Sequence, residues 1–332
     1  MPRIHLTRCQ HLSPFANILN GLGAPTALLL ERFGLPASLE EKPNHYIPIL
    51  PAIEFAEFAG SSQGIEDFGF HAARTLHFRH LSERTRNLIG NSPTLFIALQ
   101  QACKWASLED TNLSNWLEHH DDHVRYCSRL AGTRGLQHLE HSQWLQNVFP
   151  ILIVRQFAGP DWAPATIAFE ARYTPGPACQ SFWPTSRFLS GQSASWIDVP
   201  VSLLALPAKG RVPARQESDH VEHSSVDFIK SLKLMLPSYL DGRAPVLAEI
   251  AEMAGVSVRS LQRELFRAGV TYSALLDAVR FDNARKLLRD TDSKIIEIAF
   301  ASGYTDPAHF TRAFRRVAGV TPGQFREQSR PR

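Results

Sequence analysis

Two groups of basic and amide side chains recur at helical spacing in the last third of this 332-residue chain. They are Arg259, Gln262 and Arg263 in the first group, and His309, Arg312 and Arg316 in the second. Residues three and four apart lie on one face of a helix, so each group would present several hydrogen-bond donors together. Arg can bind O6 and N7 of guanine at once, and Gln can pair with N6 and N7 of adenine. This chemistry predicts a surface that contacts base edges in the major groove of DNA.

Both groups lie within two copies of one longer pattern. The first copy covers residues 250–265 and the second covers residues 298–314, and each continues into the tetrad Ala-Gly-Val-Thr, at 268–271 and at 318–321. In each copy a small residue stands four positions before a glycine, so two helices can pack closely and the chain can turn with positive φ. The repeat therefore predicts two helix-turn-helix units.

Local signals mark where the second helix of each unit begins. In the first copy Ser257 follows Gly255, and its hydroxyl can cap the next helix. In the second copy Asp306 and Pro307 follow Gly303, and an Asp-Pro pair is a strong helix start signal. Apolar residues at i and i+4 then face the core, and these are Leu261 with Leu265 and Phe310 with Phe314. The opposite face of each helix is left to the polar groups.

A long helix is predicted between the two units, over residues 273–288. It would hold the two recognition helices apart to meet successive major grooves about 34 Å from each other. A single pattern of this kind is often only a corner between two core helices. Two copies with matched glycines, caps and tails favour DNA binding over that alternative.

Charge is divided unevenly along the chain. Residues 224–332 contain 17 Lys and Arg against 12 Asp and Glu, whereas residues 1–223 contain 18 against 20. A basic balance in one domain indicates a polyanionic partner.

Domains are typically of roughly 100 to 200 residues, which suggests two domains in this chain. Segment 207–223 is rich in Pro, charge and small residues and is predicted to be the linker between domains 1–206 and 224–332.

The N-terminal domain is predicted to be an α+β domain, and the C-terminal domain to be all-α. Helices are predicted at 51–60, 92–105 and 138–157, and short strands at 113–117, 124–130, 167–171 and 196–199. Ser92 is the expected N-cap of the second helix, with Pro93 in its first turn. The order of the strands is not predicted.

The C-terminal third resembles the DNA-binding domain of the AraC/XylS family of bacterial transcription regulators. The likeness covers residues 224–328 and is most specific over 295–325. Its signature positions are Ala299, Gly303, Tyr304, Phe310, Phe314, Gly319, Pro322 and Phe325. The resemblance implies a seven-helix domain that binds double-stranded promoter DNA in the cytoplasm, activates or represses promoters and works with RNA polymerase.

The resemblance also assigns base-contacting positions. They are Arg259, Gln262 and Arg263 in the first unit, and Ala308, His309 and Arg312 in the second. Several relatives have a longer polar residue where Ala308 stands, and Pro307 is unusual. Fewer base contacts and more phosphate anchoring are therefore expected from the second unit.

Residues 1–205 resemble, more faintly, an N-terminal domain of this family that is named for arabinose binding. The matching landmarks are Gly34-Leu-Pro, Tyr46-Ile-Pro, Asp67-Phe-Gly, Ser92-Pro-Thr-Leu, Trp162-Ala-Pro and Val199-Pro-Val. Members of this branch respond to varied small molecules, so the domain name does not identify the ligand. Aromatic side chains are numerous enough to line a pocket, but its polar groups cannot be chosen from sequence.

Other chemistries find little support. The chain lacks Walker, GxGxxG and HExxH patterns, so neither an enzyme nor a cofactor is expected. Its four cysteines are far apart, which favours a reducing compartment. His119, His120 and His123 are clustered, but their spacing matches no structural zinc pattern, and no metal site is predicted. No apolar run is long enough to cross a bilayer, so no membrane partner is expected.

The favoured hypothesis is a regulator whose N-terminal domain binds a small-molecule effector of unknown identity and forms a homodimer, which changes how the helix-turn-helix pair engages DNA. The first alternative is a ligand-independent regulator whose N-terminal domain only dimerises or binds a protein partner. The second is a catalytic N-terminal domain fused to a DNA-binding module.

Overall fold

The computed structural model describes residues 3–133, 136, 138–208, 227–241 and 244–329. The chain divides into two compact units. The smaller comprises Ser224–Arg332 with the short segments Met1–Ile4 and His45–Pro48, and the larger comprises His5–Asn44 and Ile49–His223. Most of the predicted linker, residues 209–223, lies outside the described residues. Buried hydrophobic side chains occur in both units, so each has a core of its own.

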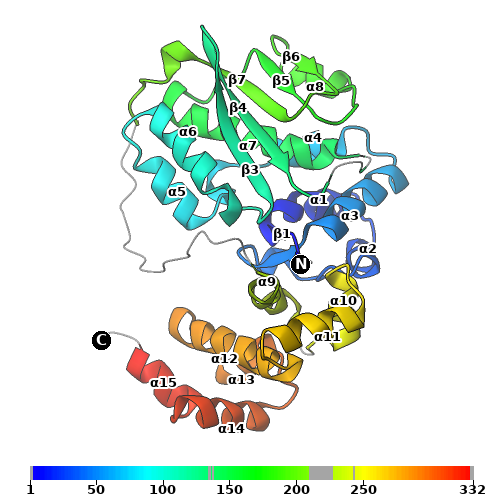
Figure 1. Ribbon diagram of the computed structural model, residues 1–332, viewed down its shortest axis with the longest axis vertical. Coiled ribbons are helices and arrows are strands. Elements are labelled where there is room, and N and C mark those ends of the chain that lie inside the picture. The colour runs from blue at the N-terminus through cyan, green and yellow to red at the C-terminus, as the bar shows by residue number, and fades with distance from the viewer. Residues whose placement is uncertain (1–2, 134–135, 137, 209–226, 242–243, 330–332) are drawn as a thin grey trace. The chain divides into compact units, whose positions relative to one another are not determined.

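A five-stranded sheet forms the centre of the larger unit (Figure 1). Its strands are β3 (Leu113–His119), β4 (His123–Leu130), β5 (Thr166–Ala168), β6 (Arg187–Leu189) and β7 (Ser195–Pro200). Their order in the sheet is β3-β4-β7-β5-β6, and neighbours are antiparallel except for the parallel pair β5 and β6. The register pairs Leu113 with Leu130 and Asn115 with Ser128, so these four side chains share one face of the sheet.

Helices pack on the sheet and extend away from it. α7 (Glu140–Ala158) contacts β4 and β7, and α6 (Leu95–Lys104) contacts β3 and α7. Other helices of this unit are α1 (Cys9–Gly21), α2 (Thr26–Arg32), α3 (Ile49–Ser62), α4 (Phe68–Ala73), α5 (Glu83–Gly90) and α8 (Pro177–Phe182). Short strands lie at Leu6–Arg8 (β1) and, in the smaller unit, at Tyr46–Pro48 (β2). The predicted α+β architecture is confirmed.

The segment Asp67-Phe-Gly joins α4 to two other parts of the larger unit. Gly69 lies so close to α7 that a Cβ atom there would be 2.4 Å from Cα of His141, so the position requires glycine. The Asp67 carboxylate accepts hydrogen bonds from the Tyr173 hydroxyl and from the backbone N–H of Gly176, the latter at 2.9 Å. These contacts connect the segment to α7 and to the residues just before α8.

Two local predictions are wrong. The N-cap of α6 is Thr94, whose hydroxyl accepts a hydrogen bond from the Ile97 backbone, whereas Ser92 donates to the Leu88 carbonyl oxygen of the preceding helix. The strand predicted over 167–171 ends at Ala168. The carbonyl oxygen of Ala168 accepts hydrogen bonds from the side chains of Asn147 and Ser195, each at 3.0 Å. The side chains of Asn147 and Ser195 thus bond the Ala168 carbonyl oxygen in place of a backbone N–H of a neighbouring strand.

The smaller unit is helical over its main described stretch, residues 227–241 and 244–329. Its helices are α9 (Phe228–Met235), α10 (Leu247–Met253), α11 (Val258–Arg267), α12 (Tyr272–Asp290), α13 (Ile295–Ala301), α14 (Pro307–Ala318) and α15 (Pro322–Ser329). The long helix α12 contains the predicted span 273–288 and connects the pair α10 and α11 to the pair α13 and α14 (Figure 1). The predicted all-α domain, with two helix-turn-helix units joined by a long helix, is confirmed.

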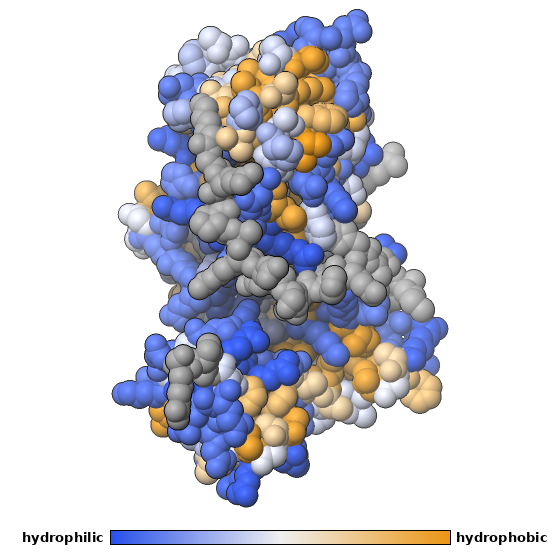
Figure 2. Space-filling model, turned by 90° about the vertical axis from the view of Figure 1, so that its left-hand side faces the viewer, coloured by the Kyte–Doolittle hydropathy of each residue, from blue (hydrophilic) through white to orange (hydrophobic). Residues whose placement is uncertain are grey.

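Large hydrophobic side chains are exposed on both units, among a mostly hydrophilic surface (Figure 2). The most exposed is Phe266, at 85%, which lies on α11. Within the described ranges, no helix combines the length and the apolar character needed to cross a membrane.

Candidate nucleic-acid interface

α10 and α11 form the first helix-turn-helix. Between them Gly255 has φ +63°, in the left-handed region that favours glycine. Ser257 caps α11, because its hydroxyl accepts a hydrogen bond from the Ser260 backbone N–H at 3.2 Å. Leu261 and Leu265 are buried. The turn and the cap set where α11 begins, and the buried leucines set which face is turned outward.

The outward face of α11 carries the first predicted group. Its exposed side chains include Arg259, Gln262 and Arg263. Arg263 Nε lies 3.8 Å from Oε1 of the buried Glu264, while Arg267 Nη1 donates a hydrogen bond to the same oxygen at 2.8 Å. Because Arg267 makes the closer contact with this carboxylate, the Arg263 guanidinium can turn toward a bound duplex without leaving a buried charge unpaired.

α13 and α14 form the second helix-turn-helix. Gly303 between them has φ +78°. The Asp306 carboxylate caps α14 twice, accepting hydrogen bonds from the backbone N–H groups of Ala308 at 2.9 Å and His309 at 3.1 Å. The Ala308 bond is the main cause of a lowered pKa of Asp306. Pro307 occupies the first helical position, where its missing N–H is not needed.

The outward face of α14 carries the second predicted group. Its exposed side chains include Ala308, His309, Arg312 and Arg316. The His309 ring lies edge-on to Tyr304, with ring centroids 5.7 Å apart. Arg312 Nη2 lies 3.9 Å from Oδ2 of Asp306. Since Ala308 offers no side-chain hydrogen bond, this face is cationic but has fewer groups suited to base recognition than α11 has.

Two side chains of α12 hold the second unit in place. Arg280 Nη2 donates to the Gly303 carbonyl oxygen at 2.9 Å, and its guanidinium carbon lies 5.1 Å from the centroid of the Tyr304 ring. Asn283 Nδ2 donates to the Ala301 carbonyl oxygen, also at 2.9 Å. These bonds satisfy carbonyl groups that the end of α13 leaves without helical partners. Arg280 and Asn283 donate to carbonyl oxygens that lie 23 and 18 positions further along the chain. Local sequence patterns do not indicate hydrogen bonds over such separations.

Phe266 adds an apolar side chain to the outward face of α11. It stands four residues after Gln262 and three after Arg263, so the three share a face. An exposed aromatic side chain at such a position can contact a thymine methyl group. The spacing of Phe266 from Gln262 and Arg263 indicates this position in the sequence. The prediction of DNA contacts from side-chain chemistry considered only polar side chains and therefore did not include it.

The clustered histidines do not form a metal site in the described part of the chain, where no group of three His, Cys, Asp or Glu side chains is placed to hold an ion. His120 and His123 instead stack, with ring centroids 4.6 Å apart. Among the described residues, no disulfide joins Cys9, Cys103, Cys127 or Cys179.

Known families match both parts of the chain. Residues 250–328 match the family described as "Helix-turn-helix domain". Residues 23–208, more than half of the chain, match the family described as "Arabinose-binding domain of AraC transcription regulator, N-term". The chain belongs to the AraC family of transcription regulators. The two matches confirm the predicted types of both domains of this AraC-family regulator.

Individual relatives of this AraC-family regulator align over shorter stretches. The HTH-type transcriptional regulator GlxA of Rhizobium meliloti is 33% identical over 136 residues, 40% of either chain. The ornithine utilization regulator of Pseudomonas aeruginosa is 32% identical over 143 residues, 40% of this chain and 41% of that one. The alignments thus span about two-fifths of the length of these relatives. The crystal structure of the transcriptional regulator CdpR from Pseudomonas aeruginosa is a loose likeness, with a TM-score of 0.38 at 18% identity over 82% of this chain and 91% of that chain.

Proposed function

We propose that this AraC-family regulator binds promoter DNA sequence-specifically through the outward faces of α11 and α14, and that a small molecule bound by its N-terminal domain changes this binding. The observation that carries the proposal is the pair of capped, glycine-turned helices whose outward faces hold Arg, Gln and His side chains. Base contacts are assigned to Arg259, Gln262 and Arg263 on α11, and contacts to bases or phosphates to Ala308, His309, Arg312 and Arg316 on α14.

The family membership supports the wider assignment. A homodimer and contact with RNA polymerase are the protein interactions proposed, and the location of promoters places the regulator in the bacterial cytoplasm. We assign it no catalytic activity, since the relatives that align with it are named as transcription regulators.

Selection of genomic DNA fragments tests the DNA-binding part. The intact chain and the double variant Arg263→Ala/Arg312→Ala are compared at moderate salt, with Arg285→Ala as the matched control. Arg285 is an exposed arginine of α12, outside both recognition helices. We expect one motif near a few promoters, recovered with the intact chain and the control and lost with the double variant. Diffuse, salt-labile binding that all three proteins share would contradict the assignment.

Effector dependence is tested on the selected motif. Saturable changes in its binding by a small molecule would support an effector-responsive regulator. Their absence, with motif binding intact, would favour the alternative in which the N-terminal domain only dimerises or binds a protein partner.

A further inference from the structure

A cavity lies inside the larger unit, between the sheet and the helices α1, α3 and α7. It offers about 80 Å³ to the centre of a water-sized sphere, several times what one water molecule needs on the same measure. Most of its lining is apolar and includes Leu12, Phe15, Ile53, Leu145, Phe149 and Ile153. This lining favours a compact apolar body over several waters, because water in a cavity needs polar partners.

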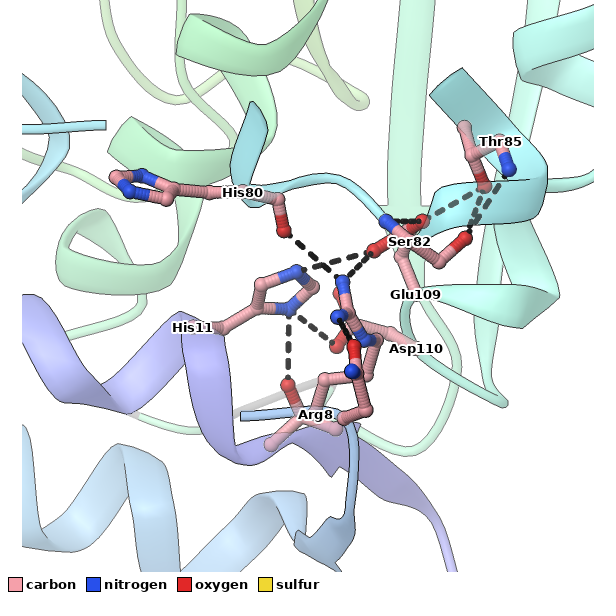
Figure 3. Close-up of polar contacts among 9 residues, drawn as sticks. Arg8, His11, His80, Ser82, Thr85, Glu109 and Asp110 are labelled. Atoms are coloured by element: carbon pink, nitrogen blue, oxygen red, sulfur yellow. Dashed lines mark hydrogen bonds and ion pairs between the residues drawn. The ribbon is translucent and has the colours of Figure 1, made fainter. Parts of the chain in front are cut away.

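The cavity borders a buried group of charges in which every charge has a counter-charge (Figure 3). Arg8 Nη1 donates to Glu109 Oε2 at 2.8 Å, and His11 Nδ1 lies 3.2 Å from Asp110 Oδ1. Glu109 Oε1 also accepts a hydrogen bond from the Thr85 hydroxyl at 2.7 Å. A charged ligand group would find no uncompensated partner here and would lose its hydration on entry.

Two polar atoms beside the cavity lack a good hydrogen bond among the described residues. Asn115 Nδ2 donates to the Tyr126 hydroxyl at 2.7 Å, but Asn115 Oδ1 is buried without a partner. His11 Nε2 is 3.4 Å from Glu109 Oε2, close enough for charge attraction, yet makes no hydrogen bond. Buried polar atoms are normally hydrogen-bonded. A ligand that donates to Asn115 Oδ1 and accepts from His11 Nε2 would satisfy both.

We propose that this cavity is the effector site, and that it takes a compact, neutral molecule with an apolar body and one polar head that both donates and accepts hydrogen bonds. That the occupant is an effector rests on the proposed function, whereas the chemistry of the site rests on the cavity alone. A sugar such as arabinose fits poorly, because most of the lining is apolar and would leave several of its hydroxyl groups without hydrogen bonds.

Four probe molecules test the ligand class on the full chain. Cyclohexanecarboxamide, cyclohexanecarboxylate and cyclohexylmethylamine share one ring and differ in the charge of the head, and L-arabinose is the fourth. Saturation-transfer NMR titrations give each affinity. We expect the carboxamide to bind at least tenfold more tightly than either charged analogue, and arabinose to show no saturable binding. Equal or tighter binding of a charged analogue or of arabinose, or no saturable binding of the carboxamide, would overturn the proposal.

Two variants place the bound probe in the cavity. Ala102 of α6 lines it and is buried, so Ala102→Leu would fill part of the space. Gln100→Leu puts the same side chain on an exposed position of the same helix and is the matched control. Asn115→Leu removes the unpaired amide oxygen. We expect a loss of about tenfold in carboxamide affinity for Ala102→Leu and for Asn115→Leu, and no change for Gln100→Leu. Unchanged affinity in folded Ala102→Leu and Asn115→Leu would exclude this cavity.

These outcomes are separate from those of the DNA selection. Carboxamide binding that depends on Ala102 and Asn115, in a chain that selects no DNA motif, would support the ligand site and refute the proposed regulator. Selection of a DNA motif by a chain that does not bind the carboxamide would support the proposed regulator and refute the ligand site.

Discussion

His11 offers a sharp test of the buried charges beside the cavity, because its protonation should link folding to pH. Burial by itself would lower the pKa of His11, but attraction and hydrogen bonding from Asp110, with a further contribution from Glu109, raise it from 6.5 to about 9. The folded chain therefore holds a proton on His11 at a pH where the unfolded chain has released it. The contribution of His11 protonation to the free energy of unfolding is therefore fully present below pH 6.5, and it is lost as the pH rises through about 9.

The size of the effect follows from the two pKa values. A difference of about 2.5 at about 1.36 kcal/mol per pKa unit corresponds to about 3 kcal/mol of unfolding free energy. The pKa values of His80 and His141 are lowered, mainly by burial, so these residues titrate below pH 6.5. The pKa of Glu109 is lowered far into the acid range. Burial raises the pKa of the Cys103, Cys127 and Cys179 thiols from 9.0 to about 12, so their effect on stability begins near pH 9 and is shared by His11→Gln.

Urea unfolding followed by tryptophan fluorescence measures this effect in the relevant part of the molecule. The chain's six tryptophans, Trp105, Trp116, Trp144, Trp162, Trp183 and Trp196, lie in the larger unit, so the signal reports on that unit. Between pH 6.5 and 9 we expect the unfolding free energy to fall by about 3 kcal/mol. His11→Gln removes the titrating group and should lack this fall. Equal slopes in the two proteins, or an NMR spectrum showing neutral His11 at pH 8, would refute the assigned charge.

Three further predictions concern the smaller unit. Gly303→Ala and Gly255→Ala both place a Cβ at positive φ, which costs about 1 to 2 kcal/mol, but only at Gly303 would that Cβ come within 3.0 Å of Leu240 Cδ2. Urea unfolding followed by circular dichroism should show the larger loss for Gly303→Ala, and equal losses would contradict the close contact. Asp306→Ala should lower the thermal stability of α14, whereas Asp306→Asn, which can still cap, should not; equal melting would exclude the capping role. Phe266→Ala should weaken binding to the selected DNA motif without changing the salt dependence, because an apolar contact releases no counterions, and a changed salt slope in binding titrations would argue against it.

The DNA-binding unit was predictable because its signals are local. Gly255, Ser257, Gly303 and Asp306 each determine a turn or a cap within a few residues of themselves, and the structure has all four in the predicted roles. The outward direction of the polar groups then follows from the buried residues at i and i+4. Arg280 was missed because it acts on Gly303, which local spacing does not connect to it.

The ligand cavity was not predictable for the opposite reason. Arg8 and Glu109 stand 101 positions apart, and His11 and Asp110 stand 99 apart, so only the folded chain brings these charges together. Apolar periodicity identifies residues that face a core but not those that leave a space between them. Strand β6 was missed as well, because its three residues are too few for an alternating pattern and depend on parallel pairing with β5.

The two recognition helices should contribute differently to DNA binding, because their outward faces differ in chemistry. α11 presents the amide of Gln262 between two arginines, whereas α14 begins with the short Ala308 and carries no amide side chain. We therefore expect Arg263→Ala to relax the preference at one base position and to weaken binding by about 1 to 3 kcal/mol.

Arg312→Ala should instead weaken binding to all sequences alike and reduce the salt slope by about 1, as the loss of one phosphate contact does. Binding titrations of both variants at several salt concentrations, on the selected motif and on single-base variants of it, separate the two effects. If Arg312→Ala relaxed one base position at an unchanged salt slope, α14 would recognise bases as α11 does. The chemical difference between the two outward faces would then not determine how each helix contacts DNA.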